Sequence, residues 1–474
     1  MDKAELIFIP VPGIGHLVST VELAKRLLHH DDRLSITLLS MKSPFGSSID
    51  AYAKPLTASE PRIRLIELPP VTPPPFDLLL KSVEAFYFSF IEAHQTHVKK
   101  IVTDIVCPVS VSSRVVGLVL DFFCAPMIDI ANELDLPSYL YVTTNAGFLG
   151  LMMYLQSRHG QNSAEFESSD PEFLIPGFVN PVPVDVLPSP VFNKFGGFTA
   201  YIKVAERIKD AKGIIVNTFE ELEPHAVTYF NNGQIQGQNP PIYPVGPMLD
   251  LNSQPNPDLD LAQRDKIIKW LDDQPQSSVV FLCFGSMGST EPTQVREIAL
   301  GLEQCGYRFL WSLRLAPPNE KDALEDMLPE GFSGTIGEKG IICRWAPQVE
   351  VLAHKAIGGF VSHCGWNSIL ESLWYRVPIV TWPMYAEQQL NAFMMVKEMG
   401  LAMELRLDYR SNSNLVMAEE IERALHQVMD GCSEVRAKVK EMSDIAKKAV
   451  KDGGSSMLSI GRLIEDMVGK KVDV

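Results

Sequence analysis

Residues 358–388 read GGFVSHCGWNSILESLWYRVPIVTWPMYAEQ, and this stretch decides which fold the sequence predicts. The apolar segments 358–363 and 377–382 are typical of buried strands, and segment 364–374 between them has apolar residues at helical spacing. A strand, a helix and a second strand in this order indicate a unit whose strands run parallel. Polar residues follow each strand, at the sheet edge where such folds bind ligands.

The same alternation continues through the rest of the chain in two series. The first series has expected strands at 4–12, 34–40, 62–69, 115–123 and within 211–223, and the second at 278–286, 307–314 and 340–345. Between them lies a proline-rich stretch without periodicity, which we interpret as a linker. The sequence therefore predicts an α/β protein with two Rossmann-like, doubly wound parallel-sheet domains facing across a cleft. Their expected limits are 1–245 and 263–455, with the linker at 246–262.

The composition is that of an ordinary globular protein, with 46% hydrophobic and 21% charged residues among 474. The net charge of -16 makes nucleic acid and anionic membranes poor partners. Apolar runs such as 115–120 are far too short to span a bilayer. The N-terminal residues do not resemble a signal peptide, and the seven cysteines are scattered without a CxxC pair. We therefore expect a cytoplasmic protein.

A glycine turn at 13–15 follows the first expected strand and places His16 at a helix N-terminus. The turn suggests a nicotinamide dinucleotide site, but Val18 replaces the third glycine of that motif and the second strand ends in Ser40 rather than an acid. The helix dipole favours a neutral imidazole, which could accept a proton. Asp121 should reach the same sheet edge, where it could orient His16 or merely cap the next helix. The spacing leaves both roles open.

Residues 345–388 carry polar groups that suit the parts of a nucleotide sugar. Free N–H groups at a helix start bind phosphate, a carboxylate accepts from two ribose hydroxyls, and an indole offers a flat surface to a base. Trp345 is the candidate for the base and Glu371 for the ribose. The candidates for the diphosphate are His363, Asn367 and Ser368, and those for the sugar are Glu387 and Gln388.

Two further motifs have both a functional and a plain interpretation. The glycine turn at 285–289 could touch a phosphate, or it could simply be a tight turn after a strand. Asp258-Leu259-Asp260 has the spacing of a metal-binding DxD, but it lies in the expected linker, where acids are commonly solvated. We therefore expect no metal site.

The segment from Trp345 to Gln388 resembles the signature box of plant secondary-product UDP-sugar glycosyltransferases, and PGIGH at 12–16 and Asp121 also resemble this family. The resemblance implies a GT-B fold whose C-terminal helix, 456–474, packs back on the first domain. It implies an inverting transfer without metal or cofactor, in which His16 is the base and Asp121 its partner. It also implies a UDP-sugar site formed by Gly15, Thr143, Ser286, Trp345, Ala346, Gln348, His363, Trp366, Asn367, Ser368, Glu371, Glu387 and Gln388.

On this resemblance we expect a UDP-glucose-dependent enzyme that forms a β-O-glucoside on a small lipophilic plant metabolite, such as a flavonoid, another phenolic or a terpenoid. Helix N–H groups and His363 would stabilise the charge of the departing diphosphate. Gln388 is the residue type associated with glucose donors, and Glu387 stands where many members have Asp.

Apolar segments of the first half and parts of the donor half supply candidates for the acceptor pocket, namely Ile14, Phe86, Phe123, Phe148, Met287 and Tyr385. We expect a monomer. Another UDP-sugar, a catalytically silent small-molecule carrier on the same fold and, more remotely, a nicotinamide-dependent oxidoreductase are the alternatives.

Overall fold

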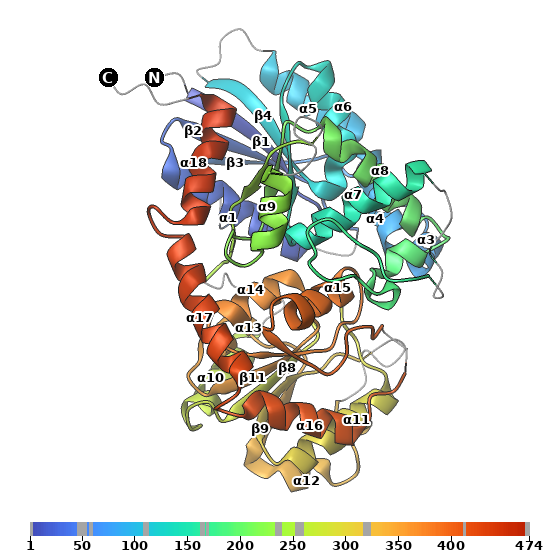
Figure 1. Cartoon of the computed structure of the whole chain (residues 1–474), viewed down its shortest axis with the longest axis vertical. Helices are drawn as coiled ribbons and strands as arrows, with labels where there is room; N and C mark the ends of the chain where they lie inside the picture. Colours follow the sequence, from blue (N-terminus) through green and yellow to red (C-terminus); the bar gives the residue numbers. More distant parts are fainter. Residues whose placement is uncertain are drawn as a thin grey trace. The chain divides into compact units, whose positions relative to one another are not determined.

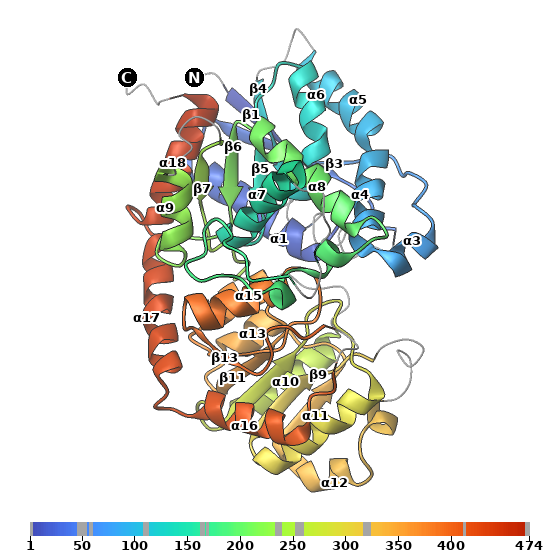
Figure 2. The same ribbon diagram turned by 45° about the vertical axis from the view of Figure 1, so that its right-hand side comes forward.

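The structure is a computed structural model that describes residues 3–44, 55, 60–107, 113–161, 166, 170–232, 239–251, 260–315, 324–410 and 414–469. The chain forms two compact units, which Figures 1 and 2 show from two directions. The first unit comprises Met1–Pro181, Pro190–Asn256 and Lys448–Val474, and the second comprises Val182–Ser189 and Pro257–Lys447. Each unit has its own parallel sheet with helices packed on it.

The first unit contains a seven-stranded parallel sheet with the strand order β3-β2-β1-β4-β5-β6-β7. The order reverses between β1 and β4, which pair with Ile9 opposite Leu120. The carboxyl ends of these two strands therefore form the switch point at which doubly wound sheets bind ligands. The strands are β1 Lys3–Ile9, β2 Leu34–Ser40, β3 Ile63–Glu67, β4 Ser113–Asp121, β5 Ser138–Val142, β6 Gly213–Val216 and β7 Ile242–Pro244.

The helices of the first unit include one from the far end of the chain. Helix α18 completes the core of this unit, because its residues Ile460 and Leu463 are fully buried (0% exposed) among side chains of α1, β1 and β2. The hydroxyl group of Tyr139 in β5 donates a 2.9 Å hydrogen bond to Asp466 of α18. The helices are α1 Ile14–His30, α3 Phe76–Lys81, α4 Val83–Ala93, α5 Gln95–Val106, α6 Ile128–Glu133, α7 Ala146–Gln161, α8 Gly197–Arg207, α9 Pro224–Asn232 and α18 Ser455–Val468.

The second unit contains a six-stranded parallel sheet with the order β10-β9-β8-β11-β12-β13, and its switch point lies between β8 and β11. The strands are β8 Val279–Cys283, β9 Arg308–Ser312, β10 Gly340–Cys343, β11 Ile357–Ser362, β12 Ile379–Thr381 and β13 Ala402–Glu404. The helices are α10 Leu261–Asp272, α11 Pro292–Cys305, α12 Phe332–Ile336, α13 Gln348–Ala353, α14 Trp366–Trp374, α15 Gln388–Phe393, α16 Ala418–Met429 and α17 Glu434–Ala449.

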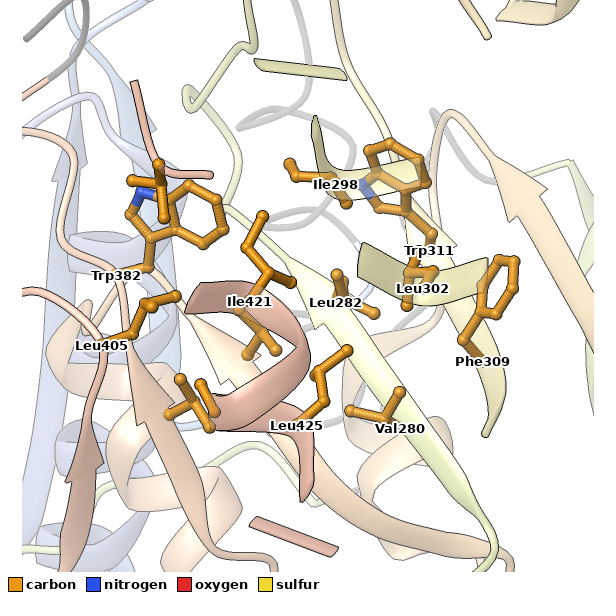
Figure 3. Packing of buried hydrophobic residues seen from close by; sticks show 14 of the residues in the cluster. Val280, Leu282, Ile298, Leu302, Phe309, Trp311, Trp382, Leu405, Ile421 and Leu425 are labelled. Atoms are coloured by element: carbon orange, nitrogen blue, oxygen red, sulfur yellow. The ribbon is translucent and has the colours of Figure 1, made fainter. Parts of the chain in front are cut away.

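One face of this second sheet is covered by α11 and α16, whose apolar side chains form the core with the strands (Figure 3). Ile421 and Leu425 of α16 and Leu302 of α11 lie over Leu282 of β8, and each is at most 1% exposed. Trp311 of β9 is fully buried in the same cluster. Burying one such aliphatic side chain stabilises a fold by about 1.5–3 kcal/mol, so this core fixes the strands whose ends carry the site.

The predicted alternation of strands and helices is confirmed, and β2 has the predicted range 34–40. The limits of the units differ from those predicted for the domains. Segment Val182–Ser189 belongs to the second unit, although the predicted domain 1–245 includes it. The reason is Arg410, whose guanidinium donates to the carbonyl groups of Asp185 and Leu187 and to the hydroxyl of Ser189.

The structure also differs from the predicted linker 246–262 at both ends. Met248 is 1% exposed and lies in the core of the first unit, where its N–H donates a 2.8 Å hydrogen bond to the side-chain oxygen of Asn217. Helix α10 already begins at Leu261, and Asp260 of the DxD motif caps it by accepting a 2.9 Å hydrogen bond from the N–H of Ala262. Asp258 lies outside the described residues. Across the described ranges, no helix is long and apolar enough to cross a membrane.

Candidate active site

The first polar cluster lies at the switch point of the first unit, where β1 and β4 end. Gly13 precedes α1 in extended conformation (φ -133°), which places His16 in the first turn of the helix. Asp121 ends β4, and its Oδ2 lies 2.7 Å from Nδ1 of His16. The side chain of Asp121 is fully buried (0% exposed), whereas 29% of the side chain of His16 is exposed. The imidazole is thus anchored inside the protein and accessible from outside it.

Asp121 performs both of the roles that its spacing left open. Its Oδ1 accepts a 3.1 Å hydrogen bond from the N–H of Phe123 and so caps the short helical turn Phe122–Met127. Its Oδ2 faces Nδ1 of His16, and the hydroxyl oxygen of Thr143 lies 3.1 Å from the same nitrogen. When Nδ1 carries the proton and donates it to Asp121, Nε2 carries the lone pair, which is the arrangement of a general base.

Two buried residues that the sequence analysis missed hold Thr143 in place. Glu223 accepts 3.0 Å hydrogen bonds from the N–H groups of Ala146 and Gly147, so it fixes the start of α7 just after Thr143. Asn217 donates from its amide to the carbonyl of Thr143 at 3.3 Å. Burial raises the pKa of Glu223, while these hydrogen bonds oppose the rise. Both residues sit in the expected strand-to-helix segment 211–223, but nothing in that pattern shows where their side chains reach.

The candidates for acceptor binding in this unit differ in how far they are exposed to solvent. Ile14 and Phe123 are partly exposed, and the ring of Phe123 lies 6.2 Å from that of His16. Phe86 and Phe148 are 1% and 2% exposed. Their rings pack in the apolar interior and offer little accessible area, and their assignment to acceptor binding stays a prediction.

The second polar cluster lies at the switch point of the second unit and is built around His363, which follows β11. The residue is 6% exposed and sits between two glycines. A Cβ atom on Gly285 would lie 2.4 Å from Nε2 of His363, and one on Gly365 would lie 2.5 Å from the same atom. Burial lowers the pKa of His363 to about 4. At neutral pH the imidazole of the ligand-free protein is therefore uncharged, and the expected contact of His363 with a diphosphate stays a prediction.

Helix α14 begins directly after this histidine and carries the expected polar residues in its first turns. Gly365 is the N-cap, Trp366 (3% exposed) is the first helical residue, and Asn367 and Ser368 follow. The amide of Gln348, at the start of α13, donates to Ser368 Oγ at 2.8 Å and to Glu371 Oε2 at 2.7 Å.

The structure thus brings Gln348 of α13 together with Ser368 and Glu371 of α14 in one hydrogen-bonded group. Ala346, which lies two residues before Gln348, is 6% exposed.

A cationic residue that the sequence analysis missed lies next to Trp345. The guanidinium carbon of Arg314 is 5.2 Å from the centre of the indole ring, and its NH1 donates to the carbonyl of Ser286. Burial lowers the pKa of Arg314. The sequence feature that could have indicated this residue is its charge at the end of the apolar stretch FLWSLR, where an expected strand ends. Met287, in the same turn as Ser286, is 59% exposed.

The side chain of Gln388, the residue associated with glucose donors, is partly bound by its own loop. Its Oε1 accepts hydrogen bonds from the N–H groups of Met384 and Tyr385, at 2.9 and 3.0 Å. Its oxygen is therefore committed to its own loop, and Nε2 is the part that can face a ligand. Burial raises the pKa of Tyr385 to about 12, and a contact with the Gln388 side chain opposes that rise. Glu387 accepts from the amide of Asn391 at 3.4 Å.

Two doubly wound parallel sheets, each with polar side chains at its switch point, define a class of nucleotide-binding α/β enzyme. Residues 243–449 match the family described as UDP-glucoronosyl and UDP-glucosyl transferase. A relative that is 55% identical over 99% of this chain shows that the chain belongs to this family.

Among its relatives, UDP-glycosyltransferase 71K1 of Malus domestica is 55% identical, with 99% of this chain and 100% of that protein covered. Flavonol 3-O-glucosyltransferase UGT71C4 of Arabidopsis thaliana is 52% identical, with 98% of each covered. The crystal structure of Medicago truncatula UGT71G1 complexed with UDP-glucose superposes with a TM-score of 0.92 at 54% identity, over 98% of each chain. The expected GT-B fold and the expected enzyme class, a UDP-glycosyltransferase that transfers a sugar from a UDP-sugar, are confirmed. The oxidoreductase alternative was wrong.

Proposed function

We propose that this UDP-glycosyltransferase transfers glucose from UDP-glucose to a hydroxyl group of a small lipophilic metabolite, inverting the anomeric configuration and using no metal ion. The observation that carries the proposal is the pair formed by His16 and Asp121, 2.7 Å apart at the switch point of the first unit. A buried carboxylate that orients a partly exposed imidazole is the arrangement that activates an alcohol for nucleophilic attack.

In this mechanism the acceptor hydroxyl gives its proton to Nε2 of His16 as its oxygen attacks the anomeric carbon. The new carbon–oxygen bond forms on the face opposite the departing UDP, which leaves with the electron pair of the broken bond, so the configuration inverts. Asp121 stabilises the imidazolium that results. General base catalysis of this kind contributes about 10²–10⁴-fold to the rate.

Two observations support glucose as the transferred sugar. A relative of 54% identity is known as a complex with UDP-glucose. In this chain, Gln388 is held by its own loop so that its amide nitrogen can donate to a sugar hydroxyl. The N–H groups at the start of α14 offer a site for the diphosphate that needs no metal ion.

The acceptor class is supported by the apolar surroundings of His16. The ring centres of Phe122 and Phe123 lie 6.0 and 6.2 Å from the imidazole, and Ile14 is in the same helical turn as His16. A flat, largely apolar molecule with a hydroxyl at its edge suits such a wall. The relative named as a flavonol 3-O-glucosyltransferase makes flavonols the first acceptors to test. All seven cysteines are free thiols, which suits the cytoplasmic location that we also propose. We further propose that the enzyme is a monomer.

The test is an incubation of the purified protein with UDP-glucose and a panel of acceptors containing a flavonol, a simple phenylpropanoid and a terpenoid alcohol, with and without EDTA. Mass spectrometry detects the glucoside, and the anomeric proton coupling in NMR gives its configuration. We expect a β-O-glucoside whose yield EDTA leaves unchanged. An α-glucoside would contradict inversion, and activity lost on chelation and restored by Mg²⁺ would contradict the metal-free mechanism. Binding of UDP-glucose and acceptor without any product would instead indicate a silent carrier.

A further inference from the structure

Arg314 lies at the sheet edge where the second polar cluster is built, although the expected donor residues do not include it. It follows β9, the neighbour of β8 in the sheet. Its backbone is fixed, because its carbonyl accepts a 2.9 Å hydrogen bond from the N–H of Thr290. Its guanidinium donates to the carbonyl of Ser286 and lies 5.2 Å from the centre of the Trp345 ring.

The positive charge of Arg314 has no carboxylate partner among the described residues, and its guanidinium is only partly exposed. Within the ranges that the structure describes, its side-chain hydrogen bond goes to the neutral carbonyl of Ser286, and no ion pair forms. Two other arginines of this unit, Arg264 and Arg406, do form ion pairs, with Glu350 and Glu420. Removing a charge from water costs free energy that a partner must offset. A guanidinium has five N–H donors, so most of them are available to an anion.

The charge of Arg314 reaches His363, which is assigned to the diphosphate, and also Tyr385. Burial is the main reason that the pKa of His363 is low, and the field of Arg314 lowers it further. The same field opposes the rise that burial causes in the pKa of Tyr385. In the ligand-free protein His363 is neutral at neutral pH, so it brings no fixed charge to the site, whereas Arg314 stays protonated.

We infer that Arg314 provides the fixed positive charge of the donor site and stabilises the diphosphate of the bound UDP-sugar and of the departing UDP. The inference rests on the proposed function, in which a diphosphate leaves without help from a metal ion. Arg314 also connects two parts of the site. It holds the turn that contains Ser286 and lies over the indole that the base is expected to stack on.

The inference is tested against a purely structural role, in which Arg314 only keeps Trp345 and the Ser286 turn in place. Calorimetry compares the binding of UDP and of uridine, which lacks the phosphates, to the wild type and to Arg314→Gln. Losing the charge should weaken UDP binding about ten- to a hundredfold. The affinity for uridine should fall by no more than about fivefold, which corresponds to the loss of a cation–π contact between Arg314 and Trp345. Arg314→Lys keeps a charge and should recover much of the affinity for UDP.

The matched control is Arg308→Gln, on the same strand β9 at the opposite edge of the sheet, which should bind UDP as the wild type does. Circular dichroism and melting curves establish that every variant is folded. Equal losses for UDP and uridine in Arg314→Gln, or an Arg314→Lys variant as weak as Arg314→Gln, would overturn the inference and leave the proposed function intact. A folded wild type that binds no UDP would instead overturn the proposed function itself.

Discussion

Gly285 leaves the space that the imidazole of His363 occupies, since a Cβ atom on this glycine would lie 2.4 Å from Nε2 of the histidine. Gly285 follows β8 and His363 follows β11, two strands that pair in the sheet with Cys283 opposite Ser362. The packing of the sheet thus brings together a glycine and a histidine that are far apart in the sequence. The orientation of the ring depends on the absence of a side chain at Gly285.

Replacing Gly285 by alanine should therefore displace His363 and weaken UDP binding. Two effects add up, the clash with the ring and the strain of an L-residue at φ +77°, which costs about 1–2 kcal/mol. Gly306→Ala separates them, because Gly306 has a similar φ of +68° and a Cβ atom there would meet no atom within 4 Å. We expect both variants to melt at lower temperature and only Gly285→Ala to lose affinity for UDP in calorimetry. Equal UDP affinities in the two variants would show that the ring is not constrained by this glycine.

The buried, neutral state of His363 makes the stability of the protein depend on pH. The pKa of this residue is about 4 in the folded protein, lowered from its ordinary value of 6.5 chiefly by burial. Between these two pH values the unfolded chain binds the extra proton, so the free energy of unfolding falls as the pH falls. The loss approaches about 1.4 kcal/mol per pH unit below pH 6 and totals on the order of 3 kcal/mol.

Urea unfolding of the wild type and of His363→Gln at several pH values between 7.5 and 4.5 measures this contribution as a difference. We expect the stability advantage of the wild type to shrink on acidification. His225→Gln, which removes an exposed histidine, should leave the pH profile unchanged. A difference between the wild type and His363→Gln that stays constant with pH would contradict the buried neutral state.

The pairing of His16 with Asp121 could be predicted from the sequence because it depends on one rule. The carboxyl ends of neighbouring parallel strands meet at one edge, and the alternation of strands and helices is strong enough to place both residues there. The acceptor residues Phe86 and Phe148 could not be placed in this way. An apolar residue on a helix has the same sequence pattern whether it lines a pocket or packs in the core, and only the folded structure gives its exposure.

The role of Gln388 and the position of Arg314 escaped the sequence for a different reason. The oxygen of Gln388 reaches two backbone N–H groups only because the loop turns sharply, with Ala386 at φ +54°. Arg314 meets Ser286 because β8 and β9 are adjacent in the sheet. Both contacts depend on how turns and strands pack, which residue types and spacing do not specify.

Two substitutions at the first switch point test the general base. His16→Ala should lower kcat about 10²–10⁴-fold toward unactivated alcohols, because the proton acceptor is lost. Asp121→Asn should also lower kcat, since an amide can donate to Nδ1 and so favour the tautomer in which Nε2 carries the proton. Neither change touches the second unit, so the affinity for UDP should stay within about twofold of the wild type.

The matched control is His29→Ala, which removes an exposed histidine from the last turn of the same helix and should leave kcat unchanged. Stopped assays with a flavonol and UDP-glucose give kcat, and calorimetry gives the dissociation constant of UDP. Wild-type turnover in folded His16→Ala would disprove the assignment of the base.

The choice of donor sugar should depend on the amide nitrogen of Gln388, because its oxygen is already held by the N–H groups of Met384 and Tyr385. A sugar with one hydroxyl inverted would leave the buried N–H without an acceptor, a mismatch that costs about 1–3 kcal/mol, or about ten- to a hundredfold in rate. When the wild type is given UDP-glucose, UDP-galactose and UDP-glucuronate at equal concentrations, the glucoside should therefore be the main product.

Two variants separate the loop from the contact with the sugar. Gln388→Glu keeps an oxygen for both backbone N–H groups and loses the amide donor, so it should melt like the wild type while the KM for UDP-glucose rises. Gln388→His loses the oxygen that holds the loop, so it should melt at lower temperature and its preference for glucose over galactose should shrink. The affinity of Gln388→Glu for UDP is measured separately. A lower affinity for UDP would show that the new carboxylate repels the diphosphate, and an unchanged affinity would show that only the contact with the sugar is lost. A wild type that prefers galactose or glucuronate would refute glucose as the donor, while the base formed by His16 and Asp121 would be unaffected, because it acts on the acceptor.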